Sequence, residues 1–499
     1  MRKFGSVTFI AAPLALAVLV ACSDGALLQR ITTLAQATSV PSASGVASAS
    51  MSPEPSSAPT PESTPSPVPT PEPTPAATPE PTPGPTPAVA PARQQAWAPA
   101  AFWTVAAGFG SGIENGAADA PGGMLGDGLP VASAYLSKPT NVAFLPDGRG
   151  LVLDRGHGVI RVDDHGVAAT WAGQVPGTPA APGVPVNQAE VRLLGTTASA
   201  VPAEVAVSPD GSVWVVDGSG QLLLMPVASG RAYGLDLEAG KAHVVPLPAE
   251  LGKPNGLSAA PDGTLVFTVV NQNKASITAH RYLYRLNLDG AVVVLAGSGS
   301  ATGLIGEEGA LLAEAPIAGP SAPHVDPDGN VWFSEVSTQL LTQQDSTTQS
   351  LSVARIMLVC LQDIEGFGGR RTAGRVYPMI GEGPRTPYSA STDVKSQVDQ
   401  GDGLPGLQAS VFKASSMAVT PEGHLVFLEP TLARLRLFDR NTGLVHRLAG
   451  PGPATEPDGP VPLAAGRLAL PTYLAVDATG DILITDFSAN RVRRVKTAP

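Results

Sequence analysis

Acidic residues at one recurring position of a repeated apolar segment are the first candidates for chemistry in this chain. The set is Asp154, Asp217, Glu335, Glu429 and Asp486. Two further carboxylates, Asp127 and Asp402, lie in Gly-Asp-Gly segments that link the repeats. Arranged around one axis, the five strand-end acids would form an anionic ring for a cation, and together with Asp127 and Asp402 they mark a candidate binding face. The alternative is that the strand-end acids accept hydrogen bonds from backbone N–H groups of the turn that follows.

The overall composition restricts the class of protein. The 499 residues include 54 Gly and 51 Pro but only 15% charged residues, which argues against coiled coils and long amphipathic helices. The formal net charge is −11 and Lys and Arg do not cluster, so no nucleic-acid partner is expected. Two cysteines, Cys22 and Cys360, are too few for a disulfide framework or a cysteine-based zinc site. The composition therefore predicts a turn-rich, all-β protein.

The N-terminus has the pattern of an export signal. Two basic residues precede an apolar stretch over residues 7–20, which is too short for a stable membrane-spanning helix. The stretch runs into Leu-Val-Ala-Cys at residues 19–22, which resembles the lipobox of bacterial lipoproteins. That resemblance implies a signal peptide over residues 1–21 and a membrane partner reached through lipid on Cys22. The alternative is an ordinary secretory signal with a chance cysteine.

A proline-rich stalk follows over residues 22–100. Between residues 53 and 91, 16 of 39 residues are proline, mostly alternating with Thr, Ser, Glu and Ala. Prolines at every second position remove hydrogen-bond donors and fix φ, so neither helix nor sheet is expected. We expect a disordered, extended polyproline II spacer that holds a domain away from the membrane. A proline-rich ligand for a recognition domain is the alternative.

Residues 101–499 contain one unit six times. In each copy an apolar segment leads into a turn, usually Pro-Asp-Gly, in which Pro presets φ and Gly tolerates positive φ. The copies span residues 139–148, 202–211, 254–263, 320–329, 414–423 and 471–480. A second apolar run follows each turn and ends in an acid in five copies, and further runs indicate a third and a fourth strand. Units of four short strands at this spacing predict a six-bladed β-propeller.

The unit resembles the NHL repeat of bacterial, teneurin-type β-propellers. The segments Gly-Asp-Gly-Leu-Pro at residues 126–130 and 401–405 are similar to the Gly-Asp-Gly-Gly-Pro stretch of those proteins. The resemblance covers about four-fifths of the chain and implies the fold, while saying little about chemistry.

Ring closure is expected to use the two ends of this region. The sixth unit stops after its third strand at residues 492–495, and Phe-Trp-Thr-Val-Ala-Ala-Gly at 102–108 is similar to the fourth strands of other units. The early segment should therefore pair into the last blade and hide both sheet edges. The connections between second and third strands, the segments between blades and the insertions at 271–280 and 337–353 should share one face. We expect the second insertion, rich in Gln, Ser and Thr, to be mobile.

An enzymatic alternative comes from a resemblance to gluconolactonase-like calcium hydrolases, which are also six-bladed propellers. The segment 254–263 is similar to the stretch that carries a metal-binding asparagine in that family, and the asparagine would map to Asn255. Six equivalent residues should surround the mouth of the channel, namely Thr140, Ala203, Asn255, Ser321, Ser415 and Thr472. None of them is acidic, whereas the family pattern needs carboxylates as well. Glu204, one place later, is expected to point into the blade packing or along the loop.

These observations favour a binding scaffold over an enzyme. We expect an exported lipoprotein, anchored to the bacterial cell envelope and at the outer membrane if the organism is diderm, that faces the periplasm or cell surface. Its loop-rich face would bind a protein or a glycan. The alternative is a calcium-dependent lactone hydrolase with Asn255 as a metal ligand; otherwise no cofactor is expected.

Overall fold

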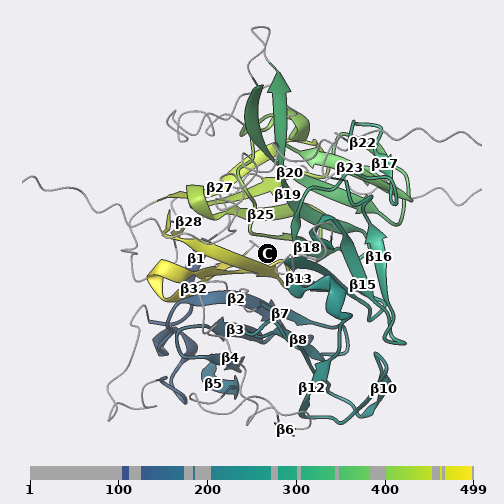
Figure 1. Ribbon diagram of the computed structural model, residues 1–499. Coiled ribbons are helices and arrows are strands. Elements are labelled where there is room, and N and C mark those ends of the chain that lie inside the picture. Colours follow the sequence, from purple (N-terminus) through teal and green to yellow (C-terminus); the bar gives the residue numbers. More distant parts are fainter. Residues whose placement is uncertain are drawn as a thin grey trace, which may run out of the picture. The chain divides into compact units, whose positions relative to one another are not determined.

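The described residues between 104 and 496 fold mainly into antiparallel strands in the computed structural model (Figure 1). The structure describes residues 104–111, 125–173, 184–185, 204–270, 279–300, 305–342, 348–381, 401–451, 461–462 and 467–496. The predicted signal peptide, Cys22 and the proline-rich stalk lie outside these ranges. Within them, no helix is long and apolar enough to cross a membrane.

Six sheets form the blades of a propeller, which confirms the predicted fold class. Blade 1 contains β2 (Pro139–Phe144), β3 (Gly150–Asp154), β4 (Val159–Asp164) and β5 (Val167–Ala172). Blade 2 contains β7 (Glu204–Val207), β8 (Val213–Val216), β9 (Leu222–Met225), β12 (Lys241–Val245) and β6 (Val184–Pro185). Blade 3 contains β13 (Lys253–Ala259), β14 (Leu265–Val270), β15 (Leu283–Leu286) and β16 (Val292–Ala296).

The remaining blades have five strands each. Blade 4 contains β18 (Pro320–Val325), β19 (Val331–Thr342), β20 (Thr348–Cys360), β23 (Arg375–Ile380) and β17 (Ala310–Leu311). Blade 5 contains β24 (Ser416–Val419), β25 (Leu425–Glu429), β26 (Arg434–Phe438), β27 (Val445–Pro451) and β29 (Arg467–Leu468). Blade 6 contains β30 (Pro471–Val476), β31 (Ile482–Asp486), β32 (Arg491–Lys496), β1 (Thr104–Phe109) and β28 (Val461–Pro462).

The first strand of each blade lines the propeller axis. These inner strands contact one another in a closed ring, in the order β2, β7, β13, β18, β24, β30 and back to β2. Apolar side chains from neighbouring blades pack between the sheets, and the largest are Trp214 and Trp332, both 0% exposed. Short, wholly apolar strands are stable here because each blade is covered on both faces.

The two ends of the propeller region meet in blade 6. Strand β1 pairs antiparallel with β32, so that Thr104 faces Lys496 and Ala106 faces Arg494. This pairing confirms the predicted closure, with a strand of residues 104–109. It completes the last sheet and covers the edge that β32 would otherwise expose.

Two hairpins extend the basic blade plan. Strands β19 and β20 continue the second and third strands of blade 4 into the insertion at 337–353, with Thr342 opposite Thr348 (Figure 1). The insertion thus includes paired strands, and its expected mobility stays a prediction. A second hairpin joins β21 (Ile364–Gly366) to β22 (Gly369–Arg371). Its tip residue Phe367 packs against Trp332 and Phe438, with ring centroids 5.1 and 4.8 Å apart, and so connects blade 4 to blade 5.

Candidate functional site

The five strand-end acids are all buried, with exposed fractions of 0–3%. Four of them accept hydrogen bonds from the backbone just before the inner strand of their own blade. The N–H groups of Ser137, Ala318, Phe412 and Leu470 donate to Asp154, Glu335, Glu429 and Asp486 at 2.9, 3.1, 2.6 and 2.9 Å, respectively. These carboxylates therefore hold the segment that enters each blade, rather than only the turn that follows the acid.

Asp217 of blade 2 departs from this arrangement. Its Oδ1 accepts hydrogen bonds from the backbone N–H groups of Ser219 and Gln221 at 2.9 and 2.8 Å. Both residues lie in the turn after β8, as the alternative interpretation of these acids expects. Blade 2 also has no arginine on its third strand, which reads Leu-Leu-Leu-Met at 222–225.

The four remaining strand-end acids lie against cationic or ionisable partners in their own blades. Glu335 pairs with Arg355, Glu429 with Arg434 at 2.9 Å, Asp486 with Arg493 at 3.3 Å, and Asp154 with His157 at 2.7 Å. Burial raises the pKa of Asp154 and of Asp486, and hydrogen bonds from their partners oppose that effect. Binding of an external cation by this set stays a prediction.

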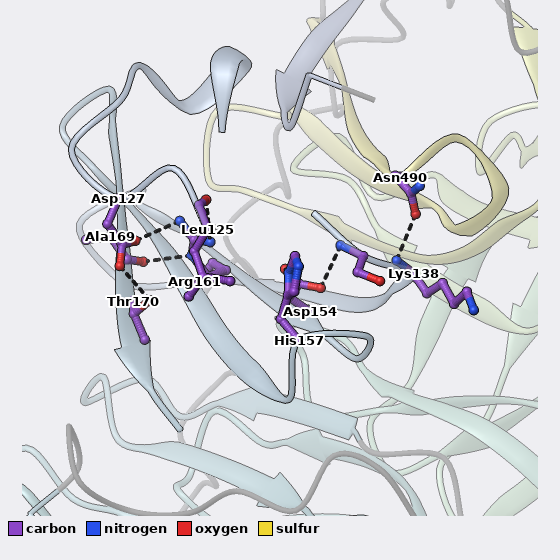
Figure 2. Close-up of polar contacts among 10 residues, drawn as sticks. Leu125, Asp127, Lys138, Asp154, His157, Arg161, Ala169, Thr170 and Asn490 are labelled. Carbon is purple, nitrogen blue, oxygen red and sulfur yellow. Dashed lines mark hydrogen bonds and ion pairs between the residues drawn. The ribbon is translucent and has the colours of Figure 1, made fainter. Parts of the chain in front are cut away.

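The two Gly-Asp-Gly segments are fastened in equivalent ways. In blade 1, Arg161 Nη2 donates to Asp127 Oδ1 at 2.8 Å and Nη1 donates to the Leu125 carbonyl at 2.9 Å (Figure 2). In blade 5, Arg436 Nε donates to Asp402 Oδ1 at 3.1 Å and Nη1 donates to the Ser410 carbonyl at 2.7 Å. Each arginine is buried and each aspartate is partly exposed. The repeat thus uses one ion pair twice to attach an interblade segment.

The predicted mouth ring lies at partly exposed positions of the inner strands. Thr140, Asn255, Ser321, Ser415 and Thr472 all have intermediate exposure, whereas Ala203 lies outside the described residues. The residue that follows the mouth position is Asn141 in β2, Glu204 in β7 and Tyr473 in β30; Asn141 is buried and the other two have intermediate exposure.

Glu204 contacts the neighbouring blade. Its Oε2 accepts a hydrogen bond from the backbone N–H of Leu257 at 3.0 Å, and the N–H of Gly256 also donates to the carboxylate. The same carboxylate lies within electrostatic range of Tyr473 on blade 6. These hydrogen bonds lie between blade 2 and blade 3, in agreement with the expectation that Glu204 points into the blade packing.

Asn141, Glu204 and Tyr473 form what we call the axial cluster, contributed by blades 1, 2 and 6. Asn141 is 1% exposed, and neither atom of its carboxamide has a hydrogen-bond partner among the described residues. The Tyr473 hydroxyl approaches this carboxamide without a hydrogen bond of normal geometry. Burial raises the pKa of Glu204 to about 7 and raises the pKa of Tyr473, which the nearby Glu204 raises further.

A second ionisable side chain, His324, faces the next blade from β18. Its Nε2 accepts a hydrogen bond from the backbone N–H of Val419 at 3.1 Å, and burial lowers its pKa to about 4. The neutral imidazole is therefore an acceptor that joins blade 4 to blade 5, as Glu204 joins blade 2 to blade 3. In the described part of the chain, no three His, Cys, Asp or Glu side chains come together as a metal site would require.

Comparison with known proteins finds only distant similarity. No protein-family model matches the chain, and no curated protein matches it. A protein of unknown function from Bacteroides thetaiotaomicron is similar over 79% of this chain and 75% of that one, at 14% identity and a TM-score of 0.47. An auxiliary nutrient binding protein from Bacteroides ovatus matches over 79% and 76%, at 12% identity and a TM-score of 0.45.

An enzyme is also among the similar structures. A gluconolactonase from Xanthomonas campestris matches over 72% of this chain and 86% of that one, at 13% identity and a TM-score of 0.37. Likeness at this level carries no inference about ligand or activity. The class of protein established here is the all-β, six-bladed propeller.

Proposed function

We propose that this protein is an exported lipoprotein whose NHL-type propeller binds a protein or a glycan through its loop-rich face. The motifs that support export, anchoring and a spacer are the lipobox-like residues 19–22 and the proline-rich segment 22–100. The six-bladed propeller gives that anchor a rigid body to present. Lipid on Cys22 is the proposed membrane partner.

The long hairpin of blade 4 is the observation that carries the binding role. Strand β18 pairs with β19 only up to Glu335, and β23 pairs with β20 only from Ile356 onward. Beyond these positions the described residues of β19 and β20 pair only with each other. Such a ribbon presents unpaired backbone N–H and C=O groups along both edges, and an extended peptide can add to an edge of this kind. A protein partner is therefore the occupant that this hairpin favours.

Shortening the hairpin tests the binding role. Replacing residues 337–353 by a two-residue Asn-Gly turn should leave blade 4 intact, because the pairings of β18 with β19 and of β23 with β20 lie outside this segment. Cross-linking in the producing cells should then lose the partner seen with the unmodified chain. A chain that lacks 15 residues of the proline-rich segment, 53–67, serves as a control of equal change in length. Identical cross-linked partners in the unmodified chain and the β19–β20 variant would contradict the proposal.

Anchoring is tested separately at Cys22. Cys22→Ala should abolish incorporation of labelled fatty acid and move the protein from the membrane fraction to the soluble fraction. Cys360→Ala is the matched control, because the buried Cys360 thiol is the other cysteine of the chain. Retention of the Cys22→Ala chain in the membrane fraction would favour an uncleaved or otherwise anchored protein.

The calcium-dependent hydrolase remains a separate hypothesis. Calorimetric titration of the full chain with Ca²⁺ distinguishes it from the binding scaffold. Tight uptake of one ion per chain that Asn255→Ala abolishes would favour the hydrolase, whereas no uptake would favour the scaffold.

A further inference from the structure

Glu204 is a partly buried carboxylate without a cationic partner among the described residues. Its hydrogen bonds come from the backbone N–H groups of Gly256 and Leu257, and no Lys, Arg or His of the described chain interacts with it. The strand-end acid Glu335, by contrast, is paired with Arg355. Moving an ionised carboxylate out of water costs free energy unless a positive charge lies nearby. A cation bound beside Glu204 would therefore be stabilised.

Asn141, beside Tyr473, adds buried polar atoms that lack hydrogen bonds to the described residues. Its buried carboxamide oxygen and nitrogen both lack hydrogen bonds within the described part of the chain, which costs free energy unless a ligand or water supplies them. The Tyr473 hydroxyl lies beside it and within electrostatic range of Glu204. Glu204 and Tyr473 are only partly buried, so solvent reaches the cluster.

We infer that the axial cluster of Asn141, Glu204 and Tyr473 is a binding site for a small molecule that carries a primary ammonium group. An ammonium group has three N–H donors and one positive charge. The cluster offers oxygen acceptors from three side chains on three blades, one of them a carboxylate. An ammonium group therefore matches the cluster in charge, and its N–H donors match the oxygen acceptors of the cluster.

Two other ligand classes fit the cluster less well. A neutral polyol would satisfy Asn141 but leave the Glu204 charge uncompensated. Ca²⁺ takes six to eight oxygen ligands, usually with several carboxylates, and the cluster has one carboxylate. The mouth residues above the cluster, such as Thr140 and Thr472, are neutral hydroxyls, and the net charge of −11 attracts cations to the protein.

A matched pair of probes tests the inference. Ethanolammonium and ethylene glycol differ mainly in the replacement of an ammonium group by a hydroxyl, and calorimetric titration of the full chain with each is the measurement. We expect one ethanolammonium site per chain and no binding of ethylene glycol. Because Glu204 has a pKa of about 7 and must be ionised to bind the cation, affinity should rise about tenfold from pH 6 to pH 8. Tyr473 is the other titratable group that faces Glu204, and its raised pKa keeps it neutral over this range.

Variants then assign the site to these residues. Glu204→Gln should remove binding and its pH dependence, and Tyr473→Phe should weaken binding severalfold without a change in pH dependence. Glu250→Gln, an exposed carboxylate in the segment before β13, should bind as the unmodified chain does. Should Glu204→Gln fail to fold, the pH profile of the unmodified chain and Tyr473→Phe still decide the question. Equal binding of ethylene glycol, competition by Ca²⁺, or unchanged binding in both cluster variants would overturn the inference.

Discussion

Arg161 Nη2 lies 2.8 Å from Asp127 Oδ1, and this ion pair attaches an interblade segment to the third strand of blade 1. Figure 2 shows that Arg161 also lies near Asp154, and the guanidinium charge favours the ionised form of that buried acid. One arginine therefore stabilises both acids that the repeat brings to this end of the blade.

Arg161→Ala should strongly destabilise the propeller. The change removes a cation that favours the ionised form of buried Asp154 and takes away the donor to the Leu125 carbonyl, while the hydrogen bonds of Asp154 with Ser137 and His157 remain. We expect the free energy of unfolding to fall by about 1–3 kcal/mol. Arg149→Ala is the control, because Arg149 pairs with Asp147 and Asp164 at the surface, where such pairs contribute about 0–1 kcal/mol. Urea unfolding of both variants is the measurement, and equal losses would contradict the structural role.

Glu204 should make stability fall as pH rises. Its pKa is about 7 in the folded chain against 4.5 for an ordinary glutamate, so the folded state binds the proton more tightly. Folding therefore favours the protonated carboxyl. The stabilisation that this proton provides is fully present below about pH 4.5 and is lost as the pH rises to about 7. Relative to Glu204→Gln, the unmodified chain should lose up to about 3 kcal/mol over this window. Denaturant unfolding at several pH values, without added ligand, measures the difference, and parallel pH profiles would contradict it.

Removal of strand β1 should open the ring. A chain without residues 104–109 exposes the edge of β32, which pairs with β1 in the complete fold. We expect a lower melting temperature and self-association through the exposed edge, measured by thermal unfolding and by size-exclusion chromatography. Removal of six residues from the proline-rich segment, 53–58, is the control of equal length. A monomeric chain with an unchanged melting temperature would show that β1 is dispensable.

The Cys360 thiol should be unreactive in the folded protein. It is 0% exposed, donates to the Gln362 carbonyl at 3.0 Å, and burial raises its pKa to about 11. Thiolate is the reactive form, so iodoacetamide at pH 8 should modify Cys360 only after unfolding in urea. Mass spectrometry with and without urea measures the modification, and rapid labelling of the native chain would contradict this environment.

The architecture was predictable because each repeat carries its own local signals. The Pro-Asp-Gly turns mark the same chain reversal in most blades; at Gly148, for example, φ is +83°, a value that glycine adopts without strain. The missing fourth strand of the sixth unit likewise pointed to β1. Periodicity alone was enough for these features, since strand count and turn position are properties of the local sequence.

The axial cluster was not predictable by counting residues. Inner strands have register shifts between Pro139 and Asn141 in blade 1 and between Pro471 and Tyr473 in blade 6. A shift of this kind changes which side chains face the axis, so strict alternation along the strand fails there. The β19–β20 hairpin was missed for another reason, since its Gln, Ser and Thr residues resemble those of a loop.

Blade 6 contains strands from both ends of the propeller sequence, residues 104–109 and 491–496. A chain that emerges progressively, from a ribosome or through a membrane channel, cannot finish this sheet until its final strand arrives. In a partly emerged chain blade 6 would be incomplete, and its unpaired strand edge would be exposed to proteases and chaperones. Resistance to digestion would therefore be acquired when residues 491–496 pair with residues 104–109.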